Sequence, residues 1–151
     1  MRWYQRFFSR RLREKKLDAE LRFHLEQQIV DYVALGVDMM DCVLPTRSAR
    51  HGCLFTSQGR VLIKNAQYAK DTRPLDETCT CAVCRRYSRA YLRHLYLANE
   101  LLASILNTHH NVHFYLDTMR KIREAIKFGN LPRFRADLQA RLEHRHSEMG
   151  V

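Results

Sequence analysis

The chain has 151 residues and a formal net charge of +10, and 46% of its residues are hydrophobic. That length suits one ordinary domain with its own core, and the hydrophobic content excludes a chain that is disordered by composition. A balance this basic indicates a polyanionic partner, either nucleic acid or an acidic membrane surface.

The first 16 residues are strongly basic. They contain seven Lys or Arg against one acid, Glu14, interleaved with aromatic residues such as Trp3 and Tyr4. A segment of this kind is either a solvated basic tail or a weak contact with a membrane surface or nucleic acid. The chain has no run of 18 apolar residues, so we predict no transmembrane segment. Its start also lacks the apolar stretch of a secretory signal.

An amphipathic helix is predicted next, over residues 17–35. Its apolar side chains recur at helical spacing: Leu17, Leu21, Leu25, Ile29 and Tyr32. Gly36 is placed to end it as a C-cap glycine. With the motifs RW (2–3) and LDAELRFHLE (17–26), residues 1–36 resemble the short prefix at the N-terminus of some bacterial ABC-type permeases.

The character of the sequence changes at Gly36. The apolar run at 38–44, closed by Pro45, predicts a strand buried on both faces. A basic loop is expected from Arg47 to Gly52. Residues 54–56 and 60–64 then flank a Ser-Gln-Gly turn and predict a β-hairpin.

Three cysteines, Cys79, Cys81 and Cys84, fall within six residues. Structural zinc takes four nitrogen or sulfur ligands in a tetrahedron, so we read the cluster as a Cys3His zinc site. The fourth ligand is expected from the group His109, His110 and His113, among which spacing alone does not choose. Disulfides and free buried thiols are the alternatives, and a short cysteine cluster without a signal peptide disfavours disulfides. The other two cysteines, Cys42 and Cys53, are expected to be small buried residues.

Three helices are predicted after the cysteines, at about 85–97, 100–128 and 133–145. The first is expected to bury a stripe of Tyr87, Tyr91, His94 or Leu95, and Ala98. The second is expected to break near 109–111. Its predicted core face repeats at three and four residues: Leu102, Ile105, His109, Val112, Leu116, Met119, Ile122 and Ile126.

From Gly36 to about residue 138 the chain resembles the C-terminal part of bacterial tRNA-guanine transglycosylase, also called queuine tRNA-ribosyltransferase. The matching motifs are GVDMMDCVLPTR (36–47), LFTSQGR (54–60), IKNA (63–66), RPLD (73–76), YSRAYLRHL (87–95), HN (110–111) and FY (114–115). The resemblance implies a TIM-barrel-type fold with a zinc subdomain, and exchange of the wobble guanine of certain tRNAs for a 7-deazaguanine base.

The resemblance also assigns roles to residues. Asp41 is implied as the covalent nucleophile, and Arg47 and Arg50 as contacts to the anticodon loop. The implied zinc ligands are Cys79, Cys81, Cys84 and His110. A carboxylate suits the chemistry, because base exchange at ribose C1′ with retained configuration needs two displacements, as in retaining glycosidases.

A complete barrel needs about 250 residues, so we expect an α+β fragment that holds the terminal strand and helices of the barrel and the zinc subdomain. The expected domains are the prefix-like region at 1–36 and the transglycosylase region at 37–146, with the zinc subdomain at about 73–128. We expect a cytoplasmic protein, with a second copy or a full-length family subunit as partner. The alternative is a non-catalytic, zinc-stabilised module that binds tRNA or a subunit.

Overall fold

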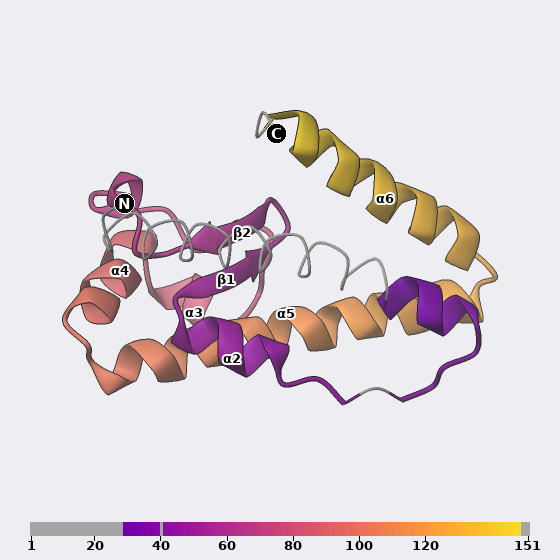
Figure 1. Ribbon diagram of the computed structural model, residues 1–151, viewed down its shortest axis with the longest axis horizontal. Coiled ribbons are helices and arrows are strands. Elements are labelled where there is room, and N and C mark those ends of the chain that lie inside the picture. The colour runs from indigo at the N-terminus through magenta and orange to yellow at the C-terminus, as the bar shows by residue number, and fades with distance from the viewer. Residues whose placement is uncertain (1–28, 40, 149–151) are drawn as a thin grey trace, which may run out of the picture. The chain divides into compact units, whose positions relative to one another are not determined.

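The computed structural model of the protein describes residues 29–39 and 41–148, with side chains up to residue 140 (Figure 1). The chain divides into two compact units, one formed by Met1–Met40 with Ala125–Val151 and the other by Asp41–Glu124. The basic segment 1–16 and the first part of the helix predicted at 17–35 lie outside the described residues. Residues 29–34 of that helix are helical, as predicted.

Gly36 ends this helix, which confirms the predicted C-cap. Its backbone has a φ of 92°, a conformation that glycine adopts without steric cost. The Gly36 amide donates to the Val33 carbonyl and the Val37 amide to the Tyr32 carbonyl, both at 3.0 Å. This pair of bonds is the Schellman motif, which satisfies carbonyls that a helix end leaves open.

The same unit contains α6, Leu131–Glu148, which starts two residues before the predicted helix and ends three residues after it. Pro132 lies in its first turn, where a missing backbone N–H costs nothing. Arg135 of α6 forms an ion pair with Asp31 at 2.8 Å. Both side chains are partly exposed, so this pair contributes little to stability. None of the described helices has the length and apolar character that crossing a membrane requires.

The strand predicted at 38–44 is wrong for the described part of that range, residues 38–39 and 41–44. Residues 41–43 have no regular structure and α2, Leu44–Arg50, follows them. Met39 is 88% exposed and Val43 59% exposed. A strand needs a neighbour to satisfy its backbone, and within the described residues none pairs with this segment. Pro45 at the start of α2 instead favours a helix, so the expected basic loop at 47–52 is mostly helical.

The predicted hairpin is confirmed. β1, Cys53–Thr56, pairs antiparallel with β2, Gly59–Leu62. Gly52 precedes it with a φ of 69°, and a Cβ at this position would lie 2.8 Å from the ring of Tyr96. The core of the unit packs around the hairpin and contains Ala49, Leu54, Val61, Ile63, Leu75, Val83 and Leu92. A short 3₁₀ turn, η1, Ala66–Tyr68, follows.

The helix predicted at 85–97 is two helices, α3, Ala82–Arg86, and α4, Arg89–Leu97. Ser88 separates them because its side chain caps α4, accepting a hydrogen bond from the Tyr91 amide at 3.2 Å. Leu92 and Leu95 form the buried face of α4, whereas Tyr91 is 40% exposed. The predicted stripe was therefore correct for Leu95 and wrong for Tyr91 and for Ala98, which is exposed.

The long helix is confirmed as α5, Leu101–Lys127, and it runs without the break expected at 109–111. Its predicted core face was largely wrong. Ile105 and Leu116 are 55% and 63% exposed, while Asn107, His110 and Asn111 are buried. Hydrophobic periodicity missed this face because polar side chains occupy it, and two of them bond to β1.

Candidate metal centre

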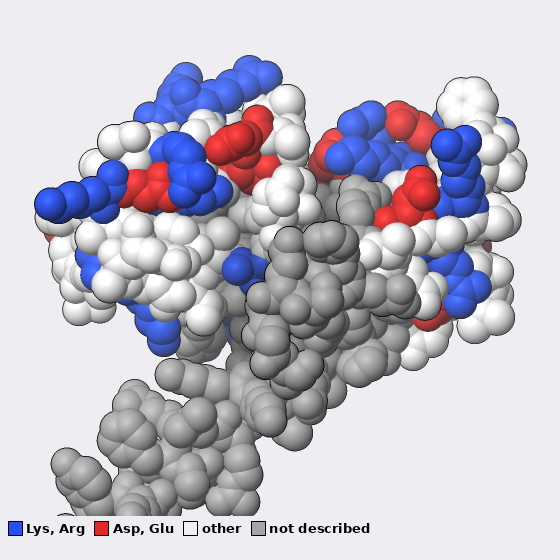
Figure 2. Space-filling model, turned by 90° about the horizontal axis from the view of Figure 1, so that it is seen from above, with Lys and Arg blue, Asp and Glu red and all other residues white. Residues whose placement is uncertain are grey.

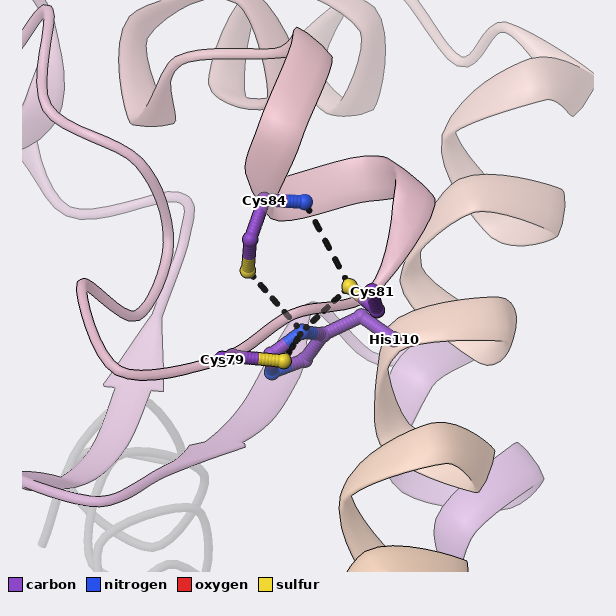
Figure 3. A group of neighbouring side chains, drawn as sticks. All are labelled: Cys79, Cys81, Cys84 and His110. Atoms are coloured by element: carbon purple, nitrogen blue, oxygen red, sulfur yellow. Dashed lines mark hydrogen bonds between the residues drawn. The ribbon is translucent and has the colours of Figure 1, made fainter.

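The three cysteines lie at the start of α3 (Figure 3). Cys79 and Cys81 precede the helix, and Cys84 lies within it. Cys81 is the N-cap of α3, and its sulfur accepts a hydrogen bond from the Cys84 amide at 3.3 Å. This cap turns the Cys81 sulfur back toward Cys84. The local fold therefore brings the thiols of Cys81 and Cys84 together.

A buried carboxylate holds the turn before the cysteines. Asp76 is 3% exposed and accepts hydrogen bonds from the Ser57 amide at 2.6 Å and from the Thr78 amide at 2.9 Å. The hydroxyls of both residues donate to it as well. Burial raises the pKa of Asp76, but these hydrogen bonds outweigh burial and the pKa is lowered. The carboxylate thus fixes the cysteine loop to the hairpin turn, a role that no sequence pattern indicated.

His110 of α5 supplies the fourth donor. Its Nδ1 lies 3.9, 3.5 and 3.4 Å from the sulfurs of Cys79, Cys81 and Cys84, and all four donor atoms lie within 4.8 Å of one another. Zinc–sulfur bonds of about 2.3 Å and a zinc–nitrogen bond of about 2.1 Å at a tetrahedral angle place sulfur and nitrogen about 3.6 Å apart. The donor set and its spacing therefore fit a tetrahedral metal site.

The four donor side chains shift one another's pKa values. A bound cation would take the place of the protons that they hold. Contacts with Cys79 and Cys84 hold the pKa of the Cys81 thiol well below its usual range, and contacts with Cys79 and Cys81 raise the pKa of Cys84. Burial lowers the pKa of His110, but its contacts with Cys79 and Cys81 outweigh burial and raise the pKa to about 9. Thiolates and a neutral imidazole are the forms that bind metal, so metal binding would release these protons.

Among the three candidate histidines, His110 alone belongs to this cluster. Its side chain is fully buried, whereas His109 is exposed and His113 partly buried. The two remaining cysteines differ. Cys53 is buried as predicted, but Cys42 is exposed, because the strand that was expected to bury it does not form.

The residues expected to act on RNA lie outside the cluster. Asp41 is exposed and comes three residues before α2, while Arg47 and Arg50 are exposed in the last turn of that helix. Residues three apart on a helix lie on the same side of it, so the two guanidinium groups share one exposed face. Figure 2 shows basic side chains interspersed with acidic ones over the described residues in that view, so net charge alone does not locate an RNA contact.

Comparison with known proteins identifies the family. A family model described as "TGT: Queuine tRNA-ribosyltransferase" matches residues 12–144. The chain belongs to the queuine tRNA-ribosyltransferase family. The match begins before Gly36 and so also includes part of the region with the permease-like pattern. That resemblance stays a prediction.

Individual members of the family match well over part of their length. The queuine tRNA-ribosyltransferase of Koribacter versatilis (strain Ellin345) is 64% identical over 103 residues, which are 68% of this chain and 27% of that protein. The protein of the same name from Solibacter usitatus (strain Ellin6076) is 55% identical over 115 residues, 76% of this chain and 30% of its own length. The chain thus spans less than a third of the length of these relatives.

Proposed function

We propose that this chain carries the nucleophile and the zinc site of a tRNA-guanine transglycosylase. The reaction would exchange the wobble guanine of tRNA for a 7-deazaguanine base, as part of queuosine modification. The observation that carries the proposal is the coincidence of the family match over residues 12–144 with a Cys3His cluster of metal-site geometry. A protein that acts on tRNA works where tRNA is found, so we expect it in the cytoplasm.

Asp41 would perform the covalent chemistry. Its carboxylate attacks ribose C1′, the bond from C1′ to the guanine nitrogen breaks, and guanine leaves with that electron pair and takes up a proton. The incoming base then attacks C1′ from the other face, gives up a proton and releases the carboxylate. Two displacements retain the configuration at C1′. The exposure of Asp41 supports this role, because a nucleophile must be reached by the ribose.

Arg47 and Arg50 would hold the RNA. Guanidinium groups bind phosphate oxygens through paired hydrogen bonds, and both side chains are exposed on one side of α2, a short distance along the chain from Asp41. Such contacts position the RNA for reaction. In this arrangement α2 would carry the RNA contacts, and the nucleophile Asp41 would lie three residues before the helix begins.

The bound metal would be Zn²⁺, one per chain, held by Cys79, Cys81, Cys84 and His110. Three thiolates and an imidazole leave no open coordination position in a tetrahedral site, which is the pattern of structural zinc. Zinc here would stabilise the fold by joining α3, the loop before it and α5. No role in the base exchange is assigned to it.

We also propose that the chain forms part of a TIM-barrel-type fold. A TIM-barrel-type fold would supply the pocket for the departing and incoming bases. The exposure of Met39 and Val43 supports this, because both are apolar side chains without a covering layer among the described residues.

A second candidate function is a non-catalytic module that binds tRNA or another subunit. The short share of the relatives' length that the chain spans favours it, as do the exposed apolar side chains Ile105 and Leu116 on α5. A partner would then be a second copy of this chain or a full-length family subunit.

A chimera distinguishes the two functions. Residues 36–138 replace the matching region of a full-length relative, and the incorporation of radiolabelled guanine into tRNA is measured. If the chain carries the enzymatic function, incorporation should lie well above background. If the chain is a non-catalytic module, a folded chimera that contains zinc should incorporate no guanine.

A further inference from the structure

One edge of the hairpin is bound by side chains of α5. In an antiparallel pair, alternate residues direct their backbone groups toward the partner strand and the others direct them away. The Ile63 amide donates to the Gly52 carbonyl at 2.9 Å, so in the observed register the groups of Cys53 and Phe55 point away from β2. If such backbone groups have no hydrogen-bond partner, their burial costs free energy. When they are exposed, they can pair with a strand of another chain.

Two consecutive residues of α5 supply hydrogen-bond partners for both backbone groups of Phe55. Nε2 of His110 donates to the Phe55 carbonyl at 2.7 Å, and the Phe55 amide donates to Oδ1 of Asn111 at 3.0 Å. His110 also belongs to the Cys3His cluster, so one member of that cluster and Asn111 bind the two backbone groups of the same residue of β1. Both side chains are therefore fixed to one position of the strand.

Asn111 extends this clamp to the helix that precedes the hairpin. Its Nδ2 donates to the carbonyls of Cys53 and Pro45, both at 3.0 Å. Pro45 lies in the first turn of α2. The side chain is fully buried, and all of its hydrogen bonds cross to other elements. One amide group thus joins α5, β1 and the beginning of α2.

The orientation of this amide is unambiguous. The three neighbours present one N–H donor and two carbonyl acceptors. Only an oxygen toward Phe55 and a nitrogen toward Cys53 and Pro45 satisfies all three, and exchanging the two atoms would leave three unfavourable contacts.

We propose that Asn111 is a positioning residue, which links the metal centre to α2 and so determines where Arg47, Arg50 and the adjoining Asp41 lie. The inference deepens the proposed function and rests on it for the role of α2. Asn111 is fully buried and does not belong to the Cys3His cluster. It acts by fixing the Pro45 carbonyl in relation to the strand that His110 also holds.

The test compares Asn111→Ala with Asn107→Ala in the full 151-residue chain. Both remove a fully buried asparagine side chain from α5, but the side chain of Asn107 makes no hydrogen bond to α2 or to any other described residue. Zinc content and folded fraction are matched before the affinity for a tRNA anticodon stem-loop is measured. We expect Asn111→Ala to bind the RNA about fivefold or more weakly, a coupling typical of linked sites. Asn107→Ala should bind like the wild type. Equal reductions in the two variants, or no reduction in Asn111→Ala, would overturn the proposal.

A measurement on the unaltered protein keeps the proposal testable if Asn111→Ala does not fold. Hydrogen exchange is followed by NMR for the side-chain amide of Asn111 and for the backbone amides of Arg47 and His51, which α2 protects. We expect all three to exchange at one slow rate, because α2 opens only when the Asn111 clamp opens. If the Asn111 amide exchanges freely while α2 stays protected, the clamp does not hold α2.

The two proposals fail in different ways. If the unaltered chain binds no RNA, the proposed role of α2 is wrong, and the exchange measurement still decides whether Asn111 holds this helix. If RNA binds but the Asn111 variant binds equally well, the proposed function stands and the positioning role is wrong.

Discussion

Nε2 of His110 lies 2.7 Å from the carbonyl oxygen of Phe55. Because a carbonyl accepts hydrogen bonds, Nε2 carries a proton, and the lone pair available for a metal is on Nδ1. That nitrogen faces the three cysteine sulfurs at 3.4–3.9 Å. A backbone carbonyl thus sets the orientation of the imidazole, which is a common arrangement around metal-binding histidines.

We expect one tightly bound zinc per chain. Elemental analysis of protein purified without added metal should give near-equimolar zinc. Cys81→Ser should lose the metal together with much of the helical circular dichroism, because metal binding and folding are coupled in small sites. Cys42→Ser is the matched control, since Cys42 is exposed and outside the cluster. A Cys81→Ser protein that lacks metal but keeps its full helicity would contradict this prediction.

Asp76→Asn should destabilise the protein by about 1.5–3 kcal/mol at pH 7, the range for hydrogen bonds to a charged group. The two oxygens of Asp76 accept from Ser57 and Thr78, and an amide nitrogen would face these donors unfavourably. Urea unfolding measures the change in stability. Glu124→Gln, which alters an exposed ion pair with Arg120, should change stability by less than about 0.5 kcal/mol.

The pH dependence of this difference follows from the lowered pKa of Asp76. The folded-state pKa lies below the unfolded value of about 3.9, so the stabilisation is complete above about pH 4 and is lost as pH falls through the folded-state pKa. The stability difference between wild type and Asp76→Asn should therefore be constant from pH 7 to about 5 and shrink below about 4. Metal content is measured at each pH in both proteins, and their stabilities are compared where it is equal. A gap that widens toward acid pH would be inconsistent with a lowered pKa.

Binding of tRNA should depend on salt and on α2. Replacing Arg47 and Arg50 together by Ala should weaken binding, because their guanidinium groups would no longer neutralise phosphates. The slope of log affinity against log salt should fall by about 0.7–0.9 for each phosphate that is no longer bound. Arg123→Ala with Lys127→Ala removes the same charge from exposed positions on α5 and serves as the control. If the α2 pair leaves affinity unchanged, the RNA binds elsewhere, and deletion of residues 1–16 tests the basic segment.

The 151-residue chain alone should not exchange guanine. A nucleophile is effective only when the substrate is held in near-attack geometry, which can be worth about 7–11 kcal/mol. In the proposed function, the base pocket would come from barrel residues that this chain does not contain. Incorporation of radiolabelled guanine by the isolated chain should equal that of Asp41→Ala, with a full-length relative as the positive control. Strong incorporation that disappears in Asp41→Ala would show that the chain is sufficient.

Local chemistry made part of this molecule predictable from its sequence. The hairpin, the helix end at Gly36 and the clustering of the three cysteines each depend on a few neighbouring residues, and the structure confirms these three features. The choice of His110 came from the family resemblance, because His109 and His113 lie equally close in sequence. The helical pitch alone does not say which of these side chains faces the thiols.

Contacts between distant segments account for what the sequence did not reveal. Periodicity assigned Ile105 and Leu116 of α5 to the core, but Asn111 and His110 are buried instead because β1 offers them open backbone groups. A strand at 38–44 would likewise need a neighbouring strand to pair with, and the local sequence cannot show whether one is present. The run of five polar residues at 107–111, which crosses the apolar helical repeat, was the available signal.

The central claim is that the carboxylate of Asp41 forms a covalent bond to ribose, and the most direct test is to isolate that adduct. The chimera that carries residues 36–138 is mixed with tRNA in the absence of an incoming base, denatured, digested and analysed by mass spectrometry. We expect an RNA adduct on the peptide that contains Asp41, and none with Asp41→Asn. An adduct on a different residue, or one that persists in Asp41→Asn, would contradict the assignment.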